Sequence, residues 1–570
     1  MVSSSGNGAS RRIRDVISKV SPLAICVMFF LIVVVYLGAV SINVLRYEGR
    51  FSPDSVVYLD TARNLLAGNG LSSTIAPLDT AITQDLTLPV PMTTWGPLYP
   101  LLIAFLSKLG VELTAAALII PIVFLAATLG AAFLLLRRCY DVPAALLGVA
   151  FLIQFSPLRM VSANAWSETT AIAFMVLFFW LVAEPECTWW KSMLAGVAGG
   201  LAFGARYAML PLFLIGGIAC VLGPKGRRAK SLGSFCAGFL IVAGPIIARN
   251  CIRAGMPLGA HIPRVNFGYA EVCAGLFRVL ADGAAPVAPL ADLLLSLLLV
   301  AMLVMTYLHA RQGELSGVLR DFFAGRQATL LLLWAVVYSA LLVRSEVRFA
   351  IDPINARLVL PASITLVLLA AGLIARMAGA RTWIPVVFAL LLAAAALPSE
   401  VSMARMLLRS KVAPPYTFDI ARSPLYQWIS DNVTGEDLLI AEDSFSLPLY
   451  MGPIRMLYFE SQLPTTKPLR YDDLSGYLGK HRREYAHAYL VLRAGLSRSG
   501  PRSPEWGSFL SDLDVGRMQP YPGMSKAIEL EDAHVFSIEP PVGSRSSATA
   551  VERELEPPGA MRAASRSSSR

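Results

Sequence analysis

Several acidic and arginine residues stand beside long apolar segments of this chain of 570 residues. Asp54 follows the first apolar segment, Glu168 precedes a later one, and Arg357 precedes another. Charged groups in such places are costly and usually have a function. A carboxylate accepts the proton of a hydroxyl or an amine, and a guanidinium binds phosphate through paired hydrogen bonds without losing its charge. The pattern therefore indicates chemistry on a phosphorylated substrate that is embedded in a membrane.

Further charged and polar residues occupy similar positions, and the topology derived below places them all on the outer side of the membrane. We expect them to meet in a cavity at the outer rim of a helical bundle. Arginine on the outer side runs against the usual bias of basic residues toward the cytoplasm, so a bound phosphate is its natural partner. The set comprises Asp54, Tyr58, Asp60, Glu168, Arg206, Tyr207, Arg249, Asn250, Arg344, Glu346, Arg348, Asp352 and Arg357.

The same residues also have purely structural interpretations. Ser52-Pro53-Asp54 is typical of a helix start, at which Asp54 would complement the helix dipole. This role is compatible with that of a catalytic base. The other structural interpretations are a weak surface ion pair of Asp60 with Arg63, helix capping by Ser167-Glu168, and interfacial placement of Arg249 and Arg357.

The composition requires a membrane. Hydrophobic residues make up 55% of the chain and charged residues 15%, whereas soluble domains carry about 25% charged residues. The segment from Pro22 to Val44 is uncharged and is long enough to cross a bilayer. A soluble domain, a disordered chain and a fibrous repeat are excluded. Basic residues on the cytoplasmic side explain the net charge of +10, so nucleic acid is not an expected partner.

Run lengths predict a polytopic α-helical membrane protein with about eleven transmembrane helices. Arg11, Arg12 and Arg14 place the N-terminus, residues 1–20, in the cytoplasm. The membrane domain is predicted at 21–398, with outer loops at 45–113 and 249–289. The predicted spans are 21–44, 114–136, 142–157, 169–183, 192–206, 207–222, 231–248, 290–310, 328–343, 358–376 and 383–398.

Alternation from a cytoplasmic start puts the hydrophilic end of the chain outside. Strand patterns at Asp437–Ala441, Ile454–Phe459, Ala488–Arg493 and His534–Ile538 are mixed with helical patterns at Pro424–Asn432 and Tyr471–Arg483. This mixture predicts a C-terminal extracytoplasmic α/β domain at 399–540. The Ser- and Arg-rich tail at 541–570 is predicted to be disordered.

The cysteines and histidines indicate no metal site, because no CxxC pair and no helical pair of histidines occurs. Cys251 and Cys273 could form a disulfide if their loop lies outside the cytoplasm. No cofactor is identified, and a divalent metal stays possible without support from the sequence.

The ordered motifs of the outer segments resemble the GT-C superfamily, integral-membrane glycosyltransferases that use polyprenyl-phosphate sugars. The branch that they resemble contains bacterial relatives of protein O-mannosyltransferases and the lipid A aminoarabinose transferase. The resemblance covers roughly residues 20–540. The motifs are Ser52-Pro53-Asp54-Ser55-Val56-Val57-Tyr58-Leu59, Ala62-Arg63-Asn64-Leu65-Leu66-Ala67-Gly68-Asn69-Gly70, Pro97-Leu98-Tyr99-Pro100, Ser167-Glu168, Arg206-Tyr207, Arg249-Asn250 with Gly255-Met256-Pro257-Leu258-Gly259, and Asp352-Pro353-Ile354 with Arg357 and Pro361.

This resemblance implies roles for individual residues. Asp54 matches the catalytic acid of the first outer loop, Glu168 matches a second acidic position, and Arg357 stands where a basic residue lies near the lipid phosphate. Many members have two adjacent acids after the first helix, but Ser55 follows Asp54 here, which puts metal dependence in doubt. The further substrate-binding candidates are Arg249, Arg206, Asp352, Asp60, Tyr58 and Asn250.

The expected protein is therefore a hexosyl- or pentosyltransferase of a bacterial inner membrane, with its site on the periplasmic side. Its partners would be a polyprenyl-phosphate-linked sugar donor, membrane lipids, and a glycan, lipid or protein acceptor. Two alternatives remain: a transporter or flippase of a lipid-linked glycan, and a non-catalytic assembly factor of the cell envelope. Transporters tend to place ionisable groups near the membrane midplane on broken, repeated helices, whereas these charges gather at outer helix ends.

Overall fold

A computed structural model describes residues 22–46, 51–83, 85–184, 188–259, 268–282, 289–349, 354–379, 382–409, 423–442, 454–459, 471–481, 483–493, 524–530 and 533–538. The predicted cytoplasmic N-terminus at 1–20, the predicted tail at 541–570 and Asp352 lie outside the described residues.

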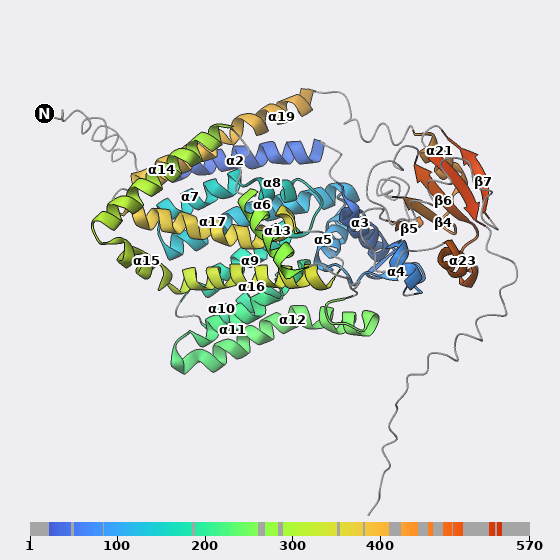
Figure 1. The fold of residues 1–570 in the computed structure, drawn as a ribbon, viewed down its shortest axis with the longest axis horizontal. Helices are drawn as coiled ribbons and strands as arrows, with labels where there is room; N and C mark the ends of the chain where they lie inside the picture. The colour runs from blue at the N-terminus through green and yellow to red at the C-terminus, as the bar shows by residue number, and fades with distance from the viewer. Residues whose placement is uncertain are drawn as a thin grey trace, which may run out of the picture.

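A bundle of apolar helices forms the larger part of the molecule (Figure 1). Each predicted spanning segment overlaps one of its helices. Their bounds are α2 (Pro22–Arg46), α6 (Leu113–Cys139), α7 (Val142–Gln154), α9 (Glu168–Val182), α10 (Trp189–Ala205), α11 (Pro211–Val221), α12 (Arg228–Ala254), α14 (Pro289–Arg311), α16 (Arg326–Arg348), α17 (Ala356–Ala378) and α18 (Trp383–Ala395).

Six helical stretches of the described chain are long and apolar enough to cross a bilayer, and the chain is an integral membrane protein. Other bundle helices are shorter. Helix α7 has 13 residues and α9 has 15, or roughly 20 Å each, whereas the hydrocarbon core is about 30 Å thick. The number of about eleven crossings therefore stays a prediction. The six stretches are Leu23–Arg46, Leu113–Cys139, Lys225–Ala254, Arg326–Arg348, Ala356–Ala378 and Trp383–Arg409.

Helices α10 and α12 pack backbone to backbone. A Cβ atom added to Gly196 would lie 2.1 Å from the carbonyl oxygen of Phe235, and one added to Gly200 would lie 3.0 Å from that of Phe239. Only glycine permits so close an approach. This contact fixes the C-terminal end of α10, where Arg206 follows.

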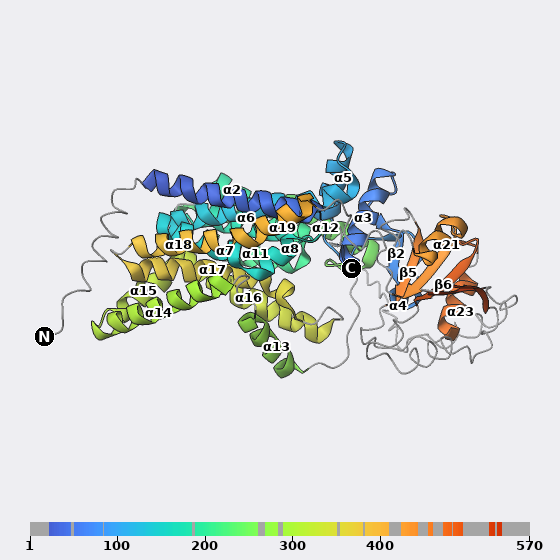
Figure 2. The same cartoon turned by 90° about the horizontal axis from the view of Figure 1, so that it is seen from above.

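Shorter helices accompany those of the bundle. Helices α3 (Pro53–Leu66) and α4 (Leu78–Thr83) lie between the bundle and the C-terminal sheet in both views (Figures 1 and 2). The others are α5 (Leu98–Lys108), α8 (Ser156–Ser162), α13 (Tyr269–Asp282), α15 (Leu315–Phe323) and α19 (Leu397–Arg409), with 3-10 turns η1 (Tyr207–Met209) and η2 (Lys225–Arg227).

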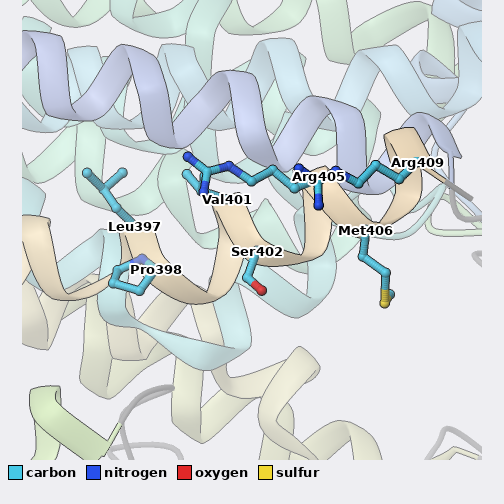
Figure 3. A pocket seen from close by; sticks show the side chains of 7 residues that line it. All are labelled: Leu397, Pro398, Val401, Ser402, Arg405, Met406 and Arg409. Atoms are coloured by element: carbon cyan, nitrogen blue, oxygen red, sulfur yellow. The ribbon is translucent and has the colours of Figure 1, made fainter.

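Helix α19 belongs to the bundle, although most of it was predicted to lie in the C-terminal domain. It packs along α2, and its Glu400 is buried, forms an ion pair with Arg159 and accepts a hydrogen bond of 2.6 Å from Asn43. The predicted boundary at residue 399 therefore falls inside a helical stretch. One side of α19 lines an open groove of about 910 Å³ with Leu397, Pro398, Val401, Ser402, Arg405, Met406 and Arg409 (Figure 3).

A six-stranded mixed sheet forms the C-terminal part, in the order β2-β5-β4-β6-β8-β7. The first four strands in this order run parallel, and β8 and β7 are antiparallel to their neighbours. The four predicted strands and both predicted helices are present, and β7 was not predicted. The elements are β4 (Leu438–Glu442), β5 (Arg455–Phe459), β6 (Ala488–Arg493), β7 (Met524–Glu529), β8 (Ala533–Ile538), α21 (Pro424–Asn432) and α23 (Tyr471–Lys480).

Alternation along the strands supplies an apolar surface on each face of the sheet. Leu438 and Ile440 of β4 pack in the cluster that contains α23, while Leu439 and Ala441 pack in the cluster that contains α21. Figure 2 shows the two helices on opposite faces of the sheet. The result is a three-layer α/β/α arrangement.

The outer loop after α3 contributes strand β2 (Ile75–Pro77) to this sheet. Ile75 pairs with Met456, and Pro77 pairs with Tyr458. The same loop forms a two-stranded ladder between β1 (Ser72–Ser73) and β3 (Val90–Pro91). The sheet is therefore built from more than the predicted range 399–540, and it holds the loop that follows Asp54.

Candidate active site

Asp54 lies in the first turn of α3, at a start that the local sequence fixes. Ser52 is the N-cap residue, its side chain accepts a hydrogen bond from the backbone N–H of Ser55, and Ser55 completes a capping box. Pro53 occupies the first helical position, where its missing N–H costs nothing. Ser55, which replaces the second acid of the related motif, thus has a structural task, and Asp54 keeps 19% of its side chain exposed.

Helix α9 begins with Ser167-Glu168, and both residues are buried. The hydroxyls of Ser167 and Tyr58 lie 3.1 Å apart, which joins α9 to α3. Burial raises the pKa of the Tyr58 hydroxyl above its ordinary value, so this group stays protonated. Glu168 is only 1% exposed, which requires cationic partners for its carboxylate.

Arg357 supplies the central cation. It lies in the first turn of α17, where Asn355 caps the helix by accepting from the backbone N–H of Leu358. Its Nη2 pairs with Oδ2 of Asp54, and its Nε pairs with Oε1 of Glu168. The guanidinium carbon lies 4.3 Å from the centre of the Trp166 ring. One arginine therefore joins both predicted catalytic acids.

Arg206 completes the cluster from the end of α10. Its extended backbone ends the helix, and its Nη1 pairs with the same Oε1 atom of Glu168. Two carboxylates and two guanidiniums from four helices thus meet in a group without net formal charge, which offsets part of the cost of burial. Within the described residues, Oε2 of Glu168 has no hydrogen-bond partner. We call Asp54, Glu168, Arg206 and Arg357 the outer cluster.

Arg249 and Asn250 serve a different part of the molecule. Arg249 donates to the carbonyl oxygens of Met92 at 2.8 Å and Leu71 at 2.7 Å. Asn250 donates to the Tyr207 hydroxyl at 3.0 Å. The two bonds of Arg249 hold the ends of the outer loop against α12, and the bond of Asn250 joins α12 to the turn η1. Substrate binding by either residue stays a prediction.

Asp60 is buried beneath the same loop. It accepts hydrogen bonds from the Ser73 hydroxyl, from Asn64, and from both the N–H and the hydroxyl of Thr74, at 2.6 to 3.3 Å. Burial raises the pKa of its carboxyl, although these hydrogen bonds oppose the rise. The interpretation as a surface pair with Arg63 is wrong, because Asp60 is 1% exposed. Four donors fill a carboxylate's acceptor positions, so Asp60 anchors the loop.

The turn between α16 and α17 is the remaining predicted part of the site. Glu346 is buried and accepts from the backbone N–H of Ile354 at 3.3 Å, whereas Arg344 and Arg348 are exposed. The prediction for Asp352 lies outside the described residues and is not tested.

Sequence reasoning missed Trp166 and the buried pair of Glu400 with Arg159. Trp166 stands next to the Ser167-Glu168 motif, and this adjacency was the available signal. Glu400 was detectable as a lone acid at the end of an apolar run. Among the described cysteines, Cys251 and Cys273 are both free, so the considered disulfide is absent. Within the described ranges, no group of three or more His, Cys, Asp or Glu residues is arranged to hold a metal ion.

A second set of charges ties the outer loop to the C-terminal sheet. Asp85 pairs with Lys480 and lies 2.9 Å from Nε2 of His481, whose Nδ1 lies 3.0 Å from Glu484. Hydrogen bonds from Lys480 and then His481 lower the pKa of Asp85. Burial alone would lower the pKa of His481, but hydrogen bonds to Glu484 and Asp85 raise it. We call Asp85, Lys480, His481 and Glu484 the loop latch.

Comparison with known proteins gives structural matches. No protein-family model matches the sequence, and no curated protein sequence matches it. ArnT from Cupriavidus metallidurans, bound to undecaprenyl phosphate, is similar with a TM-score of 0.55 at 12% identity, over 91% of this chain and 98% of that one. The apo form of ArnT gives 0.54 at 12% identity, over 90% and 97%.

A more distant match is an oligosaccharyltransferase from Archaeoglobus fulgidus, with a TM-score of 0.48 at 13% identity, over 82% of this chain and 68% of that one. The match to ArnT, in contrast, extends over nearly the whole of both chains. The chain therefore shares its fold with ArnT, in agreement with the resemblance of its ordered motifs to the GT-C superfamily.

Proposed function

We propose that this protein is a membrane glycosyltransferase that moves one sugar from a polyprenyl-phosphate donor to an acceptor outside the cytoplasm. The outer cluster carries this proposal, because it joins two carboxylates to two arginines at one end of a GT-C fold. The undecaprenyl phosphate bound to ArnT supports a polyprenyl-phosphate donor. The transferred group would be a hexose or a pentose, and the acceptor a glycan, a lipid or a protein.

Arg357 would hold the departing phosphate. Its Nε and Nη2 serve Glu168 and Asp54, and within the described residues Nη1 has no recorded partner. The N–H groups of Nη1 and the second N–H of Nη2 share an edge that suits two phosphate oxygens. As the bond between the anomeric carbon and the phosphate oxygen breaks, negative charge grows on the phosphate, and a guanidinium already in place stabilises it.

Asp54 would act as the base that takes the acceptor's proton. It is the more exposed of the two acids, at 19% against 1% for Glu168, so an acceptor hydroxyl or amine can reach it. Glycosyl transfer passes through an oxocarbenium-like state, in which a carboxylate beside the anomeric carbon is favourable. A phosphate at the free edge would share the charge of Arg357 with Asp54, so donor binding would weaken the ion pair that holds the base.

Glu168 would orient the cations and meet the sugar. Its Oε1 atom faces both Arg206 and Arg357, so it fixes the two guanidiniums relative to each other. Its Oε2 atom is buried without a partner among the described residues, and a donor hydroxyl would satisfy it. In this scheme Arg206 acts through Glu168.

The proposed location is a bacterial inner membrane with the outer cluster on the periplasmic side. The positive-inside rule supports this orientation, because the basic turn η2 and helix α15 lie at the end of the bundle opposite α3 (Figure 1).

The test is sugar transfer by purified protein in lipid vesicles, with a radiolabelled polyprenyl-phosphate sugar as donor. We expect label to leave the lipid when acceptor is present, and an Asp54→Asn protein to lack this activity. Movement of intact donor across the bilayer without cleavage would identify a transporter. An absence of both cleavage and movement would favour an assembly factor. An arm with EDTA tests metal dependence, and since Ser55 replaces the second acid we expect transfer to persist.

A further inference from the structure

We propose that Trp166 is a positioning residue that sets the placement of Asp54 relative to Arg357. This inference rests on the proposed function, in which Asp54 is the base and Arg357 holds the phosphate. Trp166 contacts the cation with its ring face and the helix of the base with its ring nitrogen. Among the described residues, no other aromatic ring forms a cation–π pair with Arg357.

The ring face of Trp166 restricts how Arg357 meets a phosphate. The guanidinium carbon lies 4.3 Å from the ring centre, a distance that gives a favourable cation–π contact. The indole thus covers one face of the guanidinium, while Asp54 and Glu168 occupy two of its nitrogens. A phosphate must then approach the edge at Nη1.

The indole N–H of Trp166 controls the start of α3. It donates to Oγ of Ser52 at 2.5 Å. The same Oγ atom accepts from the backbone N–H of Ser55 at 3.4 Å, in the capping box that begins the helix. The bond from Trp166 therefore holds the cap in the rotamer that begins the helix, and Asp54 is the second residue after the cap.

The segment that carries Trp166 is itself held on several sides. Ser167 lies within hydrogen-bonding distance of Tyr58, and Glu168 forms ion pairs with Arg206 and Arg357. The preceding helix α8 carries Arg159, which pairs with the buried Glu400 of α19. A segment held in this way keeps the ring and the indole N–H of Trp166 in fixed positions relative to Arg357 and Ser52.

Two substitutions separate the two contacts. Trp166→Leu removes both the ring face and the N–H, whereas Trp166→Phe keeps a ring and removes only the N–H. Trp383→Phe is the matched control, since Trp383 begins α18 at the far end of α17 from Arg357, about 30 Å of helix away. Its indole N–H has no partner among the described residues.

The experiment measures equilibrium binding of unlabelled polyprenyl phosphate alongside kcat and KM for the donor. We expect Trp166→Leu to weaken polyprenyl phosphate binding about tenfold, the scale of a desolvated cation–π contact. Trp166→Phe should keep binding within about twofold and lower kcat roughly fivefold, as expected for one lost hydrogen bond. Trp383→Phe should match the parent protein in both measurements.

A double variant tests the hydrogen bond to the cap. Because Trp166→Phe and Ser52→Ala remove the same bond, the double variant should lose no more kcat than Ser52→Ala alone. Losses that multiply would overturn the role of the N–H, and parent-like binding by Trp166→Leu would overturn the role of the ring. If the parent protein transfers no sugar while Trp166→Leu still weakens polyprenyl phosphate binding, the proposed function fails and the contact between Trp166 and the phosphate-binding arginine stands.

Discussion

The two ends of α9 each carry a glutamate that is held by two cations. Glu168 at the start of the helix pairs with Arg206 and Arg357. Glu184, just beyond its end, pairs with Arg138 and Lys191. Each glutamate also has an arginine over a tryptophan nearby, at 4.3 Å for Arg357 on Trp166 and 5.8 Å for Arg138 on Trp180.

The two groups differ in how completely their hydrogen-bonding groups are used. At Glu184 each carboxylate oxygen has its own cation, and Arg326 donates to its backbone carbonyl at 3.1 Å. At Glu168 both arginines share Oε1, Oε2 is left over among the described residues, and a second acid joins the group. Buried polar groups are normally satisfied. The group around Glu184, which we call the inner group, is therefore a closed clamp between helices, whereas the outer cluster keeps one carboxylate oxygen without a partner among the described residues.

The largest effect should follow from Asp54→Asn. The amide keeps the size of the side chain but cannot take up a proton, so transfer should fall by about 10²- to 10⁴-fold. The rate of sugar release from labelled donor measures this loss, and size-exclusion chromatography checks folding. Full activity in the variant would remove Asp54 from the mechanism.

Removing one arginine from the outer cluster, and then one from the inner group, sharpens the comparison. Arg357→Gln should lower kcat by roughly 10²- to 10³-fold, as for other lost electrostatic donors. Arg138→Gln at the inner end should lower thermal stability and leave transfer unchanged. Similar losses of kcat in the two variants would show that the groups around Glu168 and Glu184 do not differ in their role in transfer.

Asp60→Asn should act mainly on stability. The amide nitrogen cannot accept hydrogen bonds, so at least one donor of Ser73 or Thr74 is left buried and unsatisfied, at a cost of about 1–3 kcal/mol. Denaturant unfolding in detergent measures the change. A stability equal to that of the parent would show that Asp60 does not anchor the outer loop.

The smallest predicted effect is a pH dependence of the stability that the loop latch gives to the outer loop. The pKa of His481 is raised above its ordinary 6.5, so its contribution is complete below that value and is lost as the pH rises through the raised pKa. The lowered pKa of Asp85 adds a contribution that is lost only when the pH falls below its ordinary 3.8. Hydrogen exchange of residues 85–92 should therefore speed up as the pH rises above about 6.5.

His481→Gln is the variant that tests this source of pH dependence. In this variant, residues 85–92 should exchange at a nearly constant fast rate above about pH 6.5, after correction for intrinsic exchange. Because Asp85 and Lys480 are substantially exposed, the change in stability should stay below about 1 kcal/mol. An unchanged pH profile in the variant would exclude His481 as the titrating group.

Local patterns made most of the fold predictable. Run length located a bundle helix in each predicted span, although it missed α19, and alternation located β4, β5, β6 and β8 within one residue, because both signals lie inside one segment. Strand β2 was not predictable in this way. It has three residues and pairs with β5 across most of the chain, so its identity depends on a distant partner.

The candidate site shows the same division between what a local pattern predicts and what depends on a distant partner. Residue types and sidedness indicated Asp54, Glu168, Arg206 and Arg357, since charged groups at the ends of apolar segments are detectable locally. The same criterion selected Arg249, whose two recorded carbonyl partners lie in the outer loop. A sequence gives the type of a side chain and not its partner, and for that reason it also missed Trp166.

The most direct test of the account is an experimental structure of the protein with bound polyprenyl phosphate. We predict that the phosphate lies at the outer cluster, within hydrogen-bonding distance of Nη1 of Arg357, with the Trp166 ring still covering one face of the guanidinium. A phosphate bound elsewhere, with Arg357 still engaged by both Asp54 and Glu168, would contradict the assignment of the outer cluster as the site of transfer.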